Sequence, residues 1–465
     1  IHRPYELRWE MRNGRHDESR QNLFFATGQG RITQLLTLSR TAADEYRLQN
    51  PGDVTRHTKY SLNRVPGGRT FQARERFVVR PDDHWTLSGN VGYYFRQRDF
   101  DPGERNRYRD FAGGVKAEWN GHHGRRGEVG YRFDQYDKSD YYVATGLDVR
   151  DYSNVQHTVR ALYSTAPLPL WAEGHTLELT GGGDLARDYL LTYQFRGDAH
   201  RQFTVDGYVQ ADFHLGAQWE AVATARYDYF SVGHHGRPTT KLTARYRNGA
   251  WTLRASYGQG FRAPTLKEKY MNFFLNDIFI IRGHEQLRPE VSHNWHVSAD
   301  WSKGGTEVSS SVSYNRVLDR ITTAEPTTER DGLSGLPFVD YINVPRLTVW
   351  NAQLSVNHRR RLGSGTLSGT FQYAFTHEQA PTVGTLTPYM PARPHSATAR
   401  LAYDRRFSPQ YAVGVQLSGR FLSTLSGREY NSATGASRTL HYPAYALLRL
   451  ALTQQLGTAV RLNLT

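Results

Sequence analysis

Residues 203–215 read Phe-Thr-Val-Asp-Gly-Tyr-Val-Gln-Ala-Asp-Phe-His-Leu, with an apolar or small residue at every second position. The positions between them carry Thr, Asp, Tyr, Gln and His. A period of two residues predicts a β-strand whose two faces meet different surroundings. Because one face bears carboxylates, it does not suit the packed core of a soluble sandwich. It suits the water-filled interior of a transmembrane β-barrel, whose other face contacts lipid.

The same alternation recurs along the rest of the chain. The clearest further runs span residues 85–95, 219–227, 308–314, 367–375 and 411–421. The connections between predicted strands alternate between short and long, as in outer-membrane barrels with short turns at one rim and long loops at the other. We expect ten short connections and ten longer ones, which predicts 21 antiparallel strands. The longer ones include 41–69, 96–110, 138–152, 262–291 and 318–346, and the short ones include the turn with His358–Arg361.

The strand number also predicts how much of a barrel the chain holds. Single-chain bacterial barrels normally have an even number of strands. We therefore expect an all-β, transmembrane antiparallel β-barrel of about 22 strands, occupying residues 1–465, with the last strand missing from this sequence.

Composition supports this class of protein and excludes others. The chain has 465 residues, no Cys, 42 Gly and 29 Tyr, and only 38% of its residues are hydrophobic. The 13% of aromatic residues argues against disorder. The sequence contains no run of 18 apolar residues, so it predicts no transmembrane helix. Trp residues such as Trp85, Trp119, Trp251 and Trp301 fall where strands would cross a membrane interface. They indicate aromatic girdles or, alternatively, cross-strand aromatic pairs.

The sequence contains no recognisable catalytic constellation. It has no Gly-x-Ser-x-Gly, no His-Glu-x-x-His and no phosphate-binding loop, so we expect no enzymatic activity and no cofactor. The 58 Lys and Arg against 44 Asp and Glu give a net charge of +14. This charge fits an anionic ligand, lipopolysaccharide phosphates, or interior Arg residues facing an absent domain. Nucleic acid is not an expected partner, because the basic residues are dispersed.

Two segments in the middle of the chain are more specific than the periodicity. Residues 256–270 read Ser-Tyr-Gly-Gln-Gly-Phe-Arg-Ala-Pro-Thr-Leu-Lys-Glu-Lys-Tyr, and residues 283–290 read Gly-His-Glu-Gln-Leu-Arg-Pro-Glu. The pair resembles the two mid-barrel boxes of TonB-dependent outer-membrane transporters, most like those that take up haem or cobalamin. In the family the second box reads roughly Gly-Asn-Pro-Asn-Leu-Lys-Pro-Glu, so His284-Glu285-Gln286 is a departure. Residues 273–283 also lack the His that haem-type members carry between the boxes.

The resemblance implies a multi-pass receptor in the bacterial outer membrane. Such a receptor binds a scarce, bulky nutrient, here haem or another tetrapyrrole or metal chelate. It imports the nutrient into the periplasm with energy from the inner-membrane TonB complex. Membrane lipid, lipopolysaccharide and a surface lipoprotein are further expected partners. The family's N-terminal plug domain, which docks to TonB, has no counterpart here, and we expect it to be absent from this chain.

The loop between the boxes is the expected ligand site. No protein-bound metal is expected, although His284 is a candidate axial ligand for a haem iron. Pro264 by itself ends the strand, so the motif has a structural explanation that needs no ligand. A structural role and a ligand contact are therefore equally open for Arg262. Other candidate functions are a passive pore or a structural barrel serving a partner complex, and a receptor for cobalamin or a siderophore. The candidate substrate-binding residues are Arg262, Tyr270, Asn272, Phe274, His284 and Glu285.

Overall fold

The computed structural model describes residues 4–47, 64–195, 199–275, 278–379, 392–431, 436–457 and 460–464. Nearly all regular structure in these residues is β-strand. The main sheet contains 24 strands, of which β11, β17 and β18 are elements of two to four residues in the connections. The remaining 21 strands of the described chain confirm the predicted number. By its contacts the chain forms two compact units, which are described in turn.

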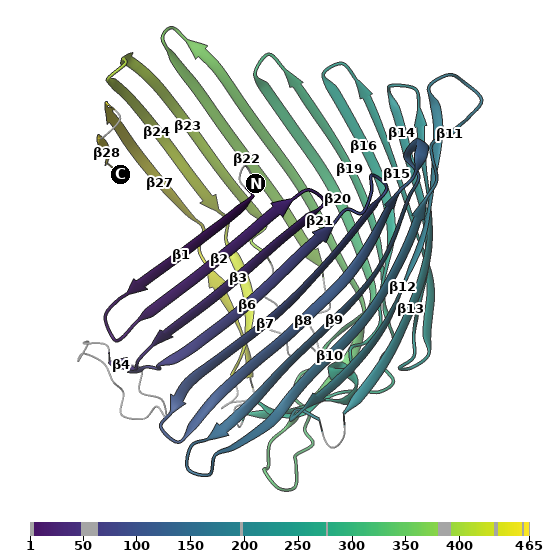
Figure 1. The fold of residues 1–465 in the computed structure, drawn as a ribbon, viewed down its shortest axis with the longest axis vertical. Helices are drawn as coiled ribbons and strands as arrows, with labels where there is room; N and C mark the ends of the chain where they lie inside the picture. Colours follow the sequence, from purple (N-terminus) through teal and green to yellow (C-terminus); the bar gives the residue numbers. More distant parts are fainter. Residues whose placement is uncertain are drawn as a thin grey trace. The chain divides into compact units, whose positions relative to one another are not determined.

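Unit 1 comprises Ile1–Pro167, Glu178–Val209 and Tyr227–Gly236. Each long strand pairs antiparallel with the next one along the chain, from β1 to β10, and β10 pairs with β12 (Figure 1). Its strands are β1 (Tyr5–Asn13), β2 (Ser19–Gln29), β3 (Ile32–Ala43), β6 (Gly68–Val79), β7 (Trp85–Asp101), β8 (Glu104–Asn120), β9 (Arg126–Tyr142) and β10 (Leu147–Ser164). The strands with residues in both units are β12 (His175–Thr192), β13 (His200–Leu215), β14 (Trp219–Phe230) and β15 (His235–Asn248).

Unit 2 comprises Leu168–Leu177, Gln210–Arg226 and Arg237–Thr465. It is a second antiparallel ladder running from β15 to β28. Its strands are β16 (Trp251–Arg262), β19 (Glu290–Lys303), β20 (Thr306–Thr323), β21 (Phe338–Leu362), β22 (Gly365–Gln379), β23 (His395–Ser408), β24 (Tyr411–Leu422), β27 (Tyr445–Leu456) and β28 (Val460–Leu464).

Short elements occupy several of the connections. They are β4 (Tyr46–Arg47), β5 (Arg64–Val65), the 3-10 turn η1 (His122–Gly124), β11 (Leu168–Pro169), helix α1 (Leu266–Tyr270), β17 (Asn272–Leu275), β18 (Phe279–Arg282), β25 (Leu425–Asn431) and β26 (Ala436–Tyr442). None of the helices in the described residues has the length and apolar character needed to cross a membrane.

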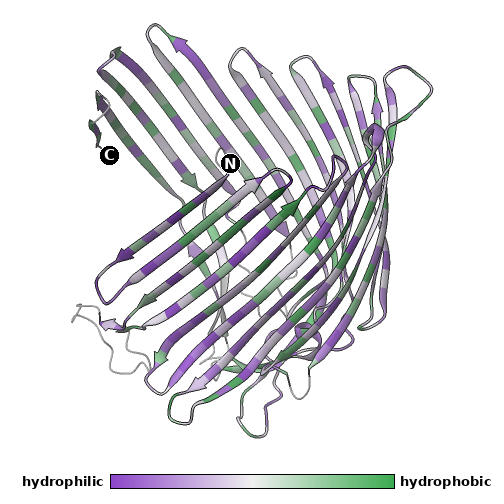
Figure 2. Cartoon of the chain, viewed as in Figure 1, coloured by the Kyte–Doolittle hydropathy of each residue, from purple (hydrophilic) through white to green (hydrophobic). Residues whose placement is uncertain are grey.

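The alternation predicted for each strand is present in the structure. Hydrophilic and hydrophobic positions alternate along the strands (Figure 2). Large apolar side chains such as Trp9, Val129 and Leu401 are more than half exposed, which a soluble sheet would avoid. Trp85 pairs with Trp119, and Trp251 with Trp301, at the ends of strands that join the short turns. These two Trp pairs have the composition of a membrane-interface girdle.

Two of the long connections predicted for unit 1 are short in the structure, so these two predictions are wrong. The 96–110 connection shrinks to Pro102-Gly103 between β7 and β8, and the 138–152 connection shrinks to residues 143–146 between β9 and β10. The polar residues that suggested loops instead form cross-strand pairs that extend the ladder. Asn106 Nδ2 donates to Asp140 Oδ1 at 2.7 Å, and Arg109 Nη2 donates to Asp148 Oδ2 at 2.6 Å.

The placement of His358–Arg361 in a turn is also wrong. These residues continue β21, whose pairing with β22 extends to Leu362 and Gly365. The turn is Gly363-Ser364, where Gly363 adopts a positive φ of 61° that a two-residue hairpin turn requires. The predicted orientation is confirmed within unit 2. His358 bonds Thr306 at the short-turn end of β20, whereas the 262–290 and 323–338 connections meet at the other end. The 41–69 connection belongs to unit 1 and lies largely outside the described residues.

Candidate functional site

The connection between β16 and β19 is a folded structure that shares a buried core with β19, β20 and β21. Of thirteen buried hydrophobic residues in the described chain, nine lie between positions 263 and 344. Ile280 and Val339 are completely buried, at 0% exposure. The nine are Ala263, Leu266, Ile280, Leu287, Val291, Ile321, Phe338, Val339 and Val344. The wall strands elsewhere bury little, so the densest packing of unit 2 lies at its long-loop end.

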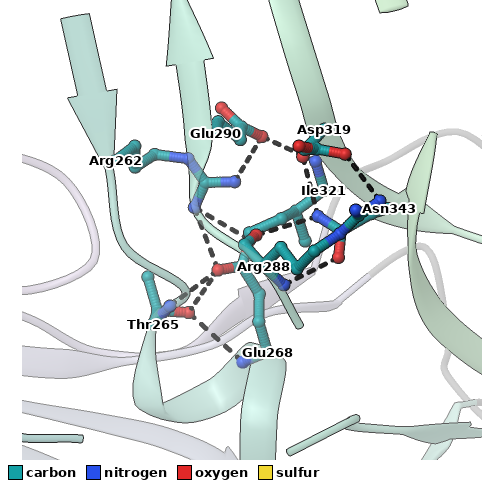
Figure 3. A network of polar contacts seen from close by, with 8 residues as sticks. All are labelled: Arg262, Thr265, Glu268, Arg288, Glu290, Asp319, Ile321 and Asn343. Carbon is teal, nitrogen blue, oxygen red and sulfur yellow. Dashed lines mark hydrogen bonds and ion pairs between the residues drawn. The ribbon is translucent and has the colours of Figure 1, made fainter. Parts of the chain in front are cut away.

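A salt-bridge cluster fixes the start and the end of this connection. Arg262 and Glu290 are directly paired residues of β16 and β19, and Arg262 Nη2 lies 2.6 Å from Glu290 Oε1. Arg262 Nη1 also contacts both carboxylate oxygens of Glu268, at 3.1 and 2.9 Å. Glu290 accepts a further bond from the Ile321 N–H at 2.8 Å. One guanidinium thus joins β16, α1 and β19 (Figure 3), which favours the structural role of Arg262.

Helix α1 begins with a capping box that uses the same glutamate. Thr265 Oγ1 accepts the Glu268 N–H at 3.2 Å, and Glu268 Oε2 accepts the Thr265 N–H at 2.7 Å (Figure 3). This reciprocal pair satisfies amides that a helix N-terminus leaves free. Glu268 therefore both caps α1 and anchors it to Arg262.

The second box docks on the C-terminal end of α1. The Gly283 N–H donates to the Met271 carbonyl at 2.6 Å, and the His284 N–H donates to the Glu268 carbonyl at 2.9 Å. The ammonium of Lys269, a residue only 4% exposed, donates to the Glu285 carbonyl at 2.7 Å. Burial lowers the pKa of the Lys269 amine. The sequence boxes, separated by the twelve residues 271–282, thus form one hydrogen-bonded unit.

The connection is also joined to the neighbouring long loop. Strands β17 and β18 form a hairpin, and β18 pairs in parallel with the start of β21. Arg282 bridges Asp340 at 2.7 Å and Glu329 at 3.0 Å, with its guanidinium 3.9 Å from the centre of the Phe338 ring. Asn343 receives the Arg288 N–H at 2.8 Å and donates to the Arg288 carbonyl at 2.9 Å (Figure 3). The 262–290 and 323–338 connections are therefore held together and form one continuous surface.

The structure separates the candidate ligand residues into three groups. The side chains of His284 and Glu285 are exposed, and Phe274 is 46% exposed. Tyr270 and Asn272 are half-buried at the base of the hairpin. The Arg262 side chain is 40% exposed, but both of its terminal nitrogens, Nη1 and Nη2, form salt bridges with carboxylates. No group of three His, Asp or Glu side chains arranged to hold a metal occurs in the described part of the chain.

The sequence analysis missed a row of tyrosines on the polar face of unit 1. Tyr94, Tyr108, Tyr136 and Tyr152 lie on four adjacent strands, β7 to β10, and are all partly exposed. The rings of Tyr136 and Tyr152 are 5.9 Å apart in an edge-to-face arrangement. The two-residue alternation of the sequence could have predicted this row, because adjacent residues of a strand such as Tyr93 and Tyr94 point to opposite faces. The row adds an aromatic surface that a bulky ligand could contact.

The pH response of the cluster follows from Glu290. Burial raises the pKa of its carboxyl, but hydrogen bonds from Arg262 and the Ile321 N–H outweigh burial and hold it below the ordinary value. Because the pKa of Glu290 is lower in the folded protein than in the unfolded chain, its ionised carboxylate stabilises the loop. This stabilisation is complete at pH values above the unfolded-state pKa of about 4.3. That stability is lost as the pH falls from there through the folded-state pKa.

We therefore expect amide protection in the 262–290 connection, corrected for intrinsic exchange, to decrease between pH 6 and pH 3. Glu290→Gln should remove most of this pH dependence, because it removes the titrating group. An unchanged pH profile in Glu290→Gln would show that another group controls the loop. Glu285→Gln, at an exposed position of the same loop, is the control and should keep the wild-type profile.

The fold and site together define a transmembrane β-barrel of the outer-membrane type, with long strands, short turns at one end and folded loops at the other. Residues 8–465 match the family model described as TonB dependent receptor-like, beta-barrel. The chain therefore belongs to the TonB-dependent receptor family, as the two boxes predicted. Sequence comparison with individual curated proteins returns no match.

Solved structures with the same fold include three receptors of low sequence identity. A variant of the ferric enterobactin receptor PfeA of Pseudomonas aeruginosa has a TM-score of 0.67 and 13% identity, over 99% of this chain and 73% of that one. The siderophore receptor PirA of Acinetobacter baumannii has a TM-score of 0.63 and 13% identity, over 97% and 73%. The FrpB iron transporter of Neisseria meningitidis has a TM-score of 0.66 and 11% identity, over 99% and 75%. At these identities the likeness concerns the fold.

Proposed function

We propose that this protein is a bacterial outer-membrane receptor that binds an iron chelate at the cell surface and imports it with energy from TonB. The observation that carries the proposal is the family match over residues 8–465. Neighbours of the same fold are described as siderophore receptors and an iron transporter, which favours a siderophore over haem or cobalamin as the ligand. The protein acts in this proposal as a receptor and transporter rather than as an enzyme.

The joined loops at the long-loop end of unit 2 are the proposed ligand surface. Long loops of outer-membrane barrels lie on the extracellular side. Phe274, His284 and Glu285 are exposed on a packed support, and such support holds contact residues in place before the ligand arrives. Tyr270 and Asn272 are proposed as deeper contacts. Haem remains the second candidate because the His284 side chain is exposed and offers an axial nitrogen. Lipopolysaccharide and a surface lipoprotein remain predicted partners.

The transport proposal is tested with the product of the complete gene in a strain that lacks its own iron receptors. We expect uptake of radiolabelled iron from at least one siderophore, saturable and abolished when TonB is deleted. Haem and cobalamin are tested in the same strain. Uptake that is unaffected by TonB deletion and linear in ligand concentration would instead establish a passive pore.

The ligand surface is tested by a triple variant, Phe274→Ala with His284→Ala and Glu285→Ala. These side chains are exposed, so the loop should keep its fold while the affinity falls at least tenfold, or about 1.4 kcal/mol. Arg361→Ala, at an exposed position beside the short Gly363-Ser364 turn at the opposite end of unit 2, is the control and should bind normally. If the triple variant binds within about twofold of wild type, this loop is not the binding element.

A further inference from the structure

The apolar face of unit 1 contains a depression that the receptor function does not use. It has a volume of about 690 Å³ and lies over β7 to β12, close to their short turns. Trp85, Trp119 and Tyr163 border it, and Val129 and four glycines line it, among them Gly127 and Gly181. Its lining is mostly apolar, in contrast to the polar face of the same strands.

Glycines create the depression by leaving out side chains between large rings. Gly127 is paired with both Trp119 and Tyr163, and Gly181 is paired with Tyr163. The rings of Trp119 and Tyr163 are stacked with centres 6.4 Å apart. A Cβ at Gly181 would have no neighbour closer than 3.9 Å, and one at Gly127 none closer than 3.7 Å. The space beside these glycines is therefore open toward the surroundings of the barrel.

Those surroundings are the acyl chains of the membrane. Trp85, Tyr163 and Val129 are 42%, 47% and 56% exposed, which is stable on a lipid-facing wall. Trp85 is the first residue of β7 and Trp119 the last but one of β8, both beside short turns, the position of an interfacial girdle. Short turns of this family type face the periplasm, so the depression opens into the leaflet built from phospholipids.

The turn next to the depression supplies a free positive charge at headgroup level. Arg125 follows η1 directly, is exposed, and has no ion-pair partner in the part of the chain that the structure describes. The adjacent Arg126 is instead paired with Glu178 at 3.4 Å. Asp82, an exposed carboxylate of the neighbouring turn, accepts the backbone N–H groups of His84 and Trp85 within its own turn.

We propose that this depression is a binding site for an anionic phospholipid of the periplasmic leaflet. One acyl chain lies in the groove over Gly127 and Gly181, between the rings of Trp119 and Tyr163. The phosphate group contacts Arg125 in the turn. Arg125 provides charge complementarity, and the groove provides a shape that a smooth barrel wall lacks.

Native mass spectrometry of the purified full-length protein tests the site. The detergent solution contains phosphatidylglycerol and phosphatidylcholine with identical acyl chains. We expect wild type to carry one phosphatidylglycerol with at least fivefold preference over phosphatidylcholine. Gly181→Leu and Gly127→Val fill the groove and should each lower the lipid-bound fraction at least fivefold. Arg125→Gln should abolish the preference between the two lipids while some binding remains.

Matched controls use unit 2. Gly369 also lies on an apolar strand face, and a Cβ there would have no neighbour closer than 3.8 Å, so Gly369→Val should leave lipid binding unchanged. Arg361→Gln likewise removes an exposed charge near a short turn. Heat-dependent gel mobility verifies that each barrel is folded. Equal binding of both lipids by wild type, undiminished binding by both groove variants, or equal losses in the controls would each overturn the proposal.

Discussion

Arg262→Ala is expected to release the 262–290 connection from the barrel, with a loss of about 2 kcal/mol of local stability. The substitution leaves two carboxylates, Glu268 and Glu290, without their cation, although their side chains are only 15% and 18% exposed. Breaking a fully buried ion pair by removing one partner costs about 3–5 kcal/mol. Because Arg262 itself is 40% exposed, solvent screening reduces this figure.

Hydrogen exchange measures the expected release of the loop. A loss of 2 kcal/mol corresponds to a decrease of roughly 30-fold in the protection of α1, β18 and the Ile321 amide. The β22–β24 ladder should keep its protection, since it does not contact Arg262. Ligand affinity should fall as well, because the proposed contact residues lose their support. Arg262→Lys should have an intermediate effect, because an ammonium keeps the charge but cannot fork between two carboxylates.

Arg288→Ala is the matched control. Arg288 also bridges an acidic residue, with 2.7 Å between Arg288 Nη2 and Asp319 Oδ1, but its side chain is 68% exposed. Its backbone remains held by Asn343 after the side chain is removed. We expect a loss below about 1 kcal/mol, as for other exposed ion pairs. Equal effects of Arg262→Ala and Arg288→Ala would contradict the assignment of Arg262 as the central clamp.

The strands were predictable from the sequence because each face meets only one kind of surroundings. In the run from Phe203 to Leu215, lipid on one side and water on the other impose a strict period of two. The predicted loops at 96–110 and 138–152 failed for a related reason. Beyond the membrane both faces of a strand meet water, so pairs such as Asn106 with Asp140 continue the ladder without any apolar alternation.

The candidate site was located from its motif, but its internal structure was not predictable. The alternation of connection lengths placed the 262–290 connection correctly at the long-loop end, and the two boxes singled it out as the candidate ligand loop. The partners of Arg262 depend on which residues converge in space, and Glu268 and Glu290 are 6 and 28 positions away in the chain. The parallel pairing of β18 with β21 joins segments 58 positions apart, such as Arg282 and Asp340, through contacts that no local pattern encodes.

Gly283→Val is expected to detach the second box from α1, with a loss of roughly 3 kcal/mol, at the upper end of overpacking costs. A Cβ at Gly283 would lie 2.5 Å from the Lys269 carbonyl carbon, 2.6 Å from its oxygen and 2.6 Å from the Tyr270 nitrogen. All three atoms belong to the backbone, so no side chain can rotate away. The displacement would break the bonds from Gly283 and His284 to the end of α1.

Gly332→Val distinguishes this close approach from a general effect of losing a loop glycine. Gly332 lies in the adjoining long loop, and a Cβ there would meet nothing within 4 Å. Neither glycine has a left-handed φ, so backbone strain is absent from the comparison. Exchange protection of α1 should fall in Gly283→Val and stay at the wild-type value in Gly332→Val, and ligand affinity should fall in Gly283→Val. If Gly283→Val preserved both, the second box would be a passive linker, because its docking on α1 would not hold His284 and Glu285 in place for a ligand.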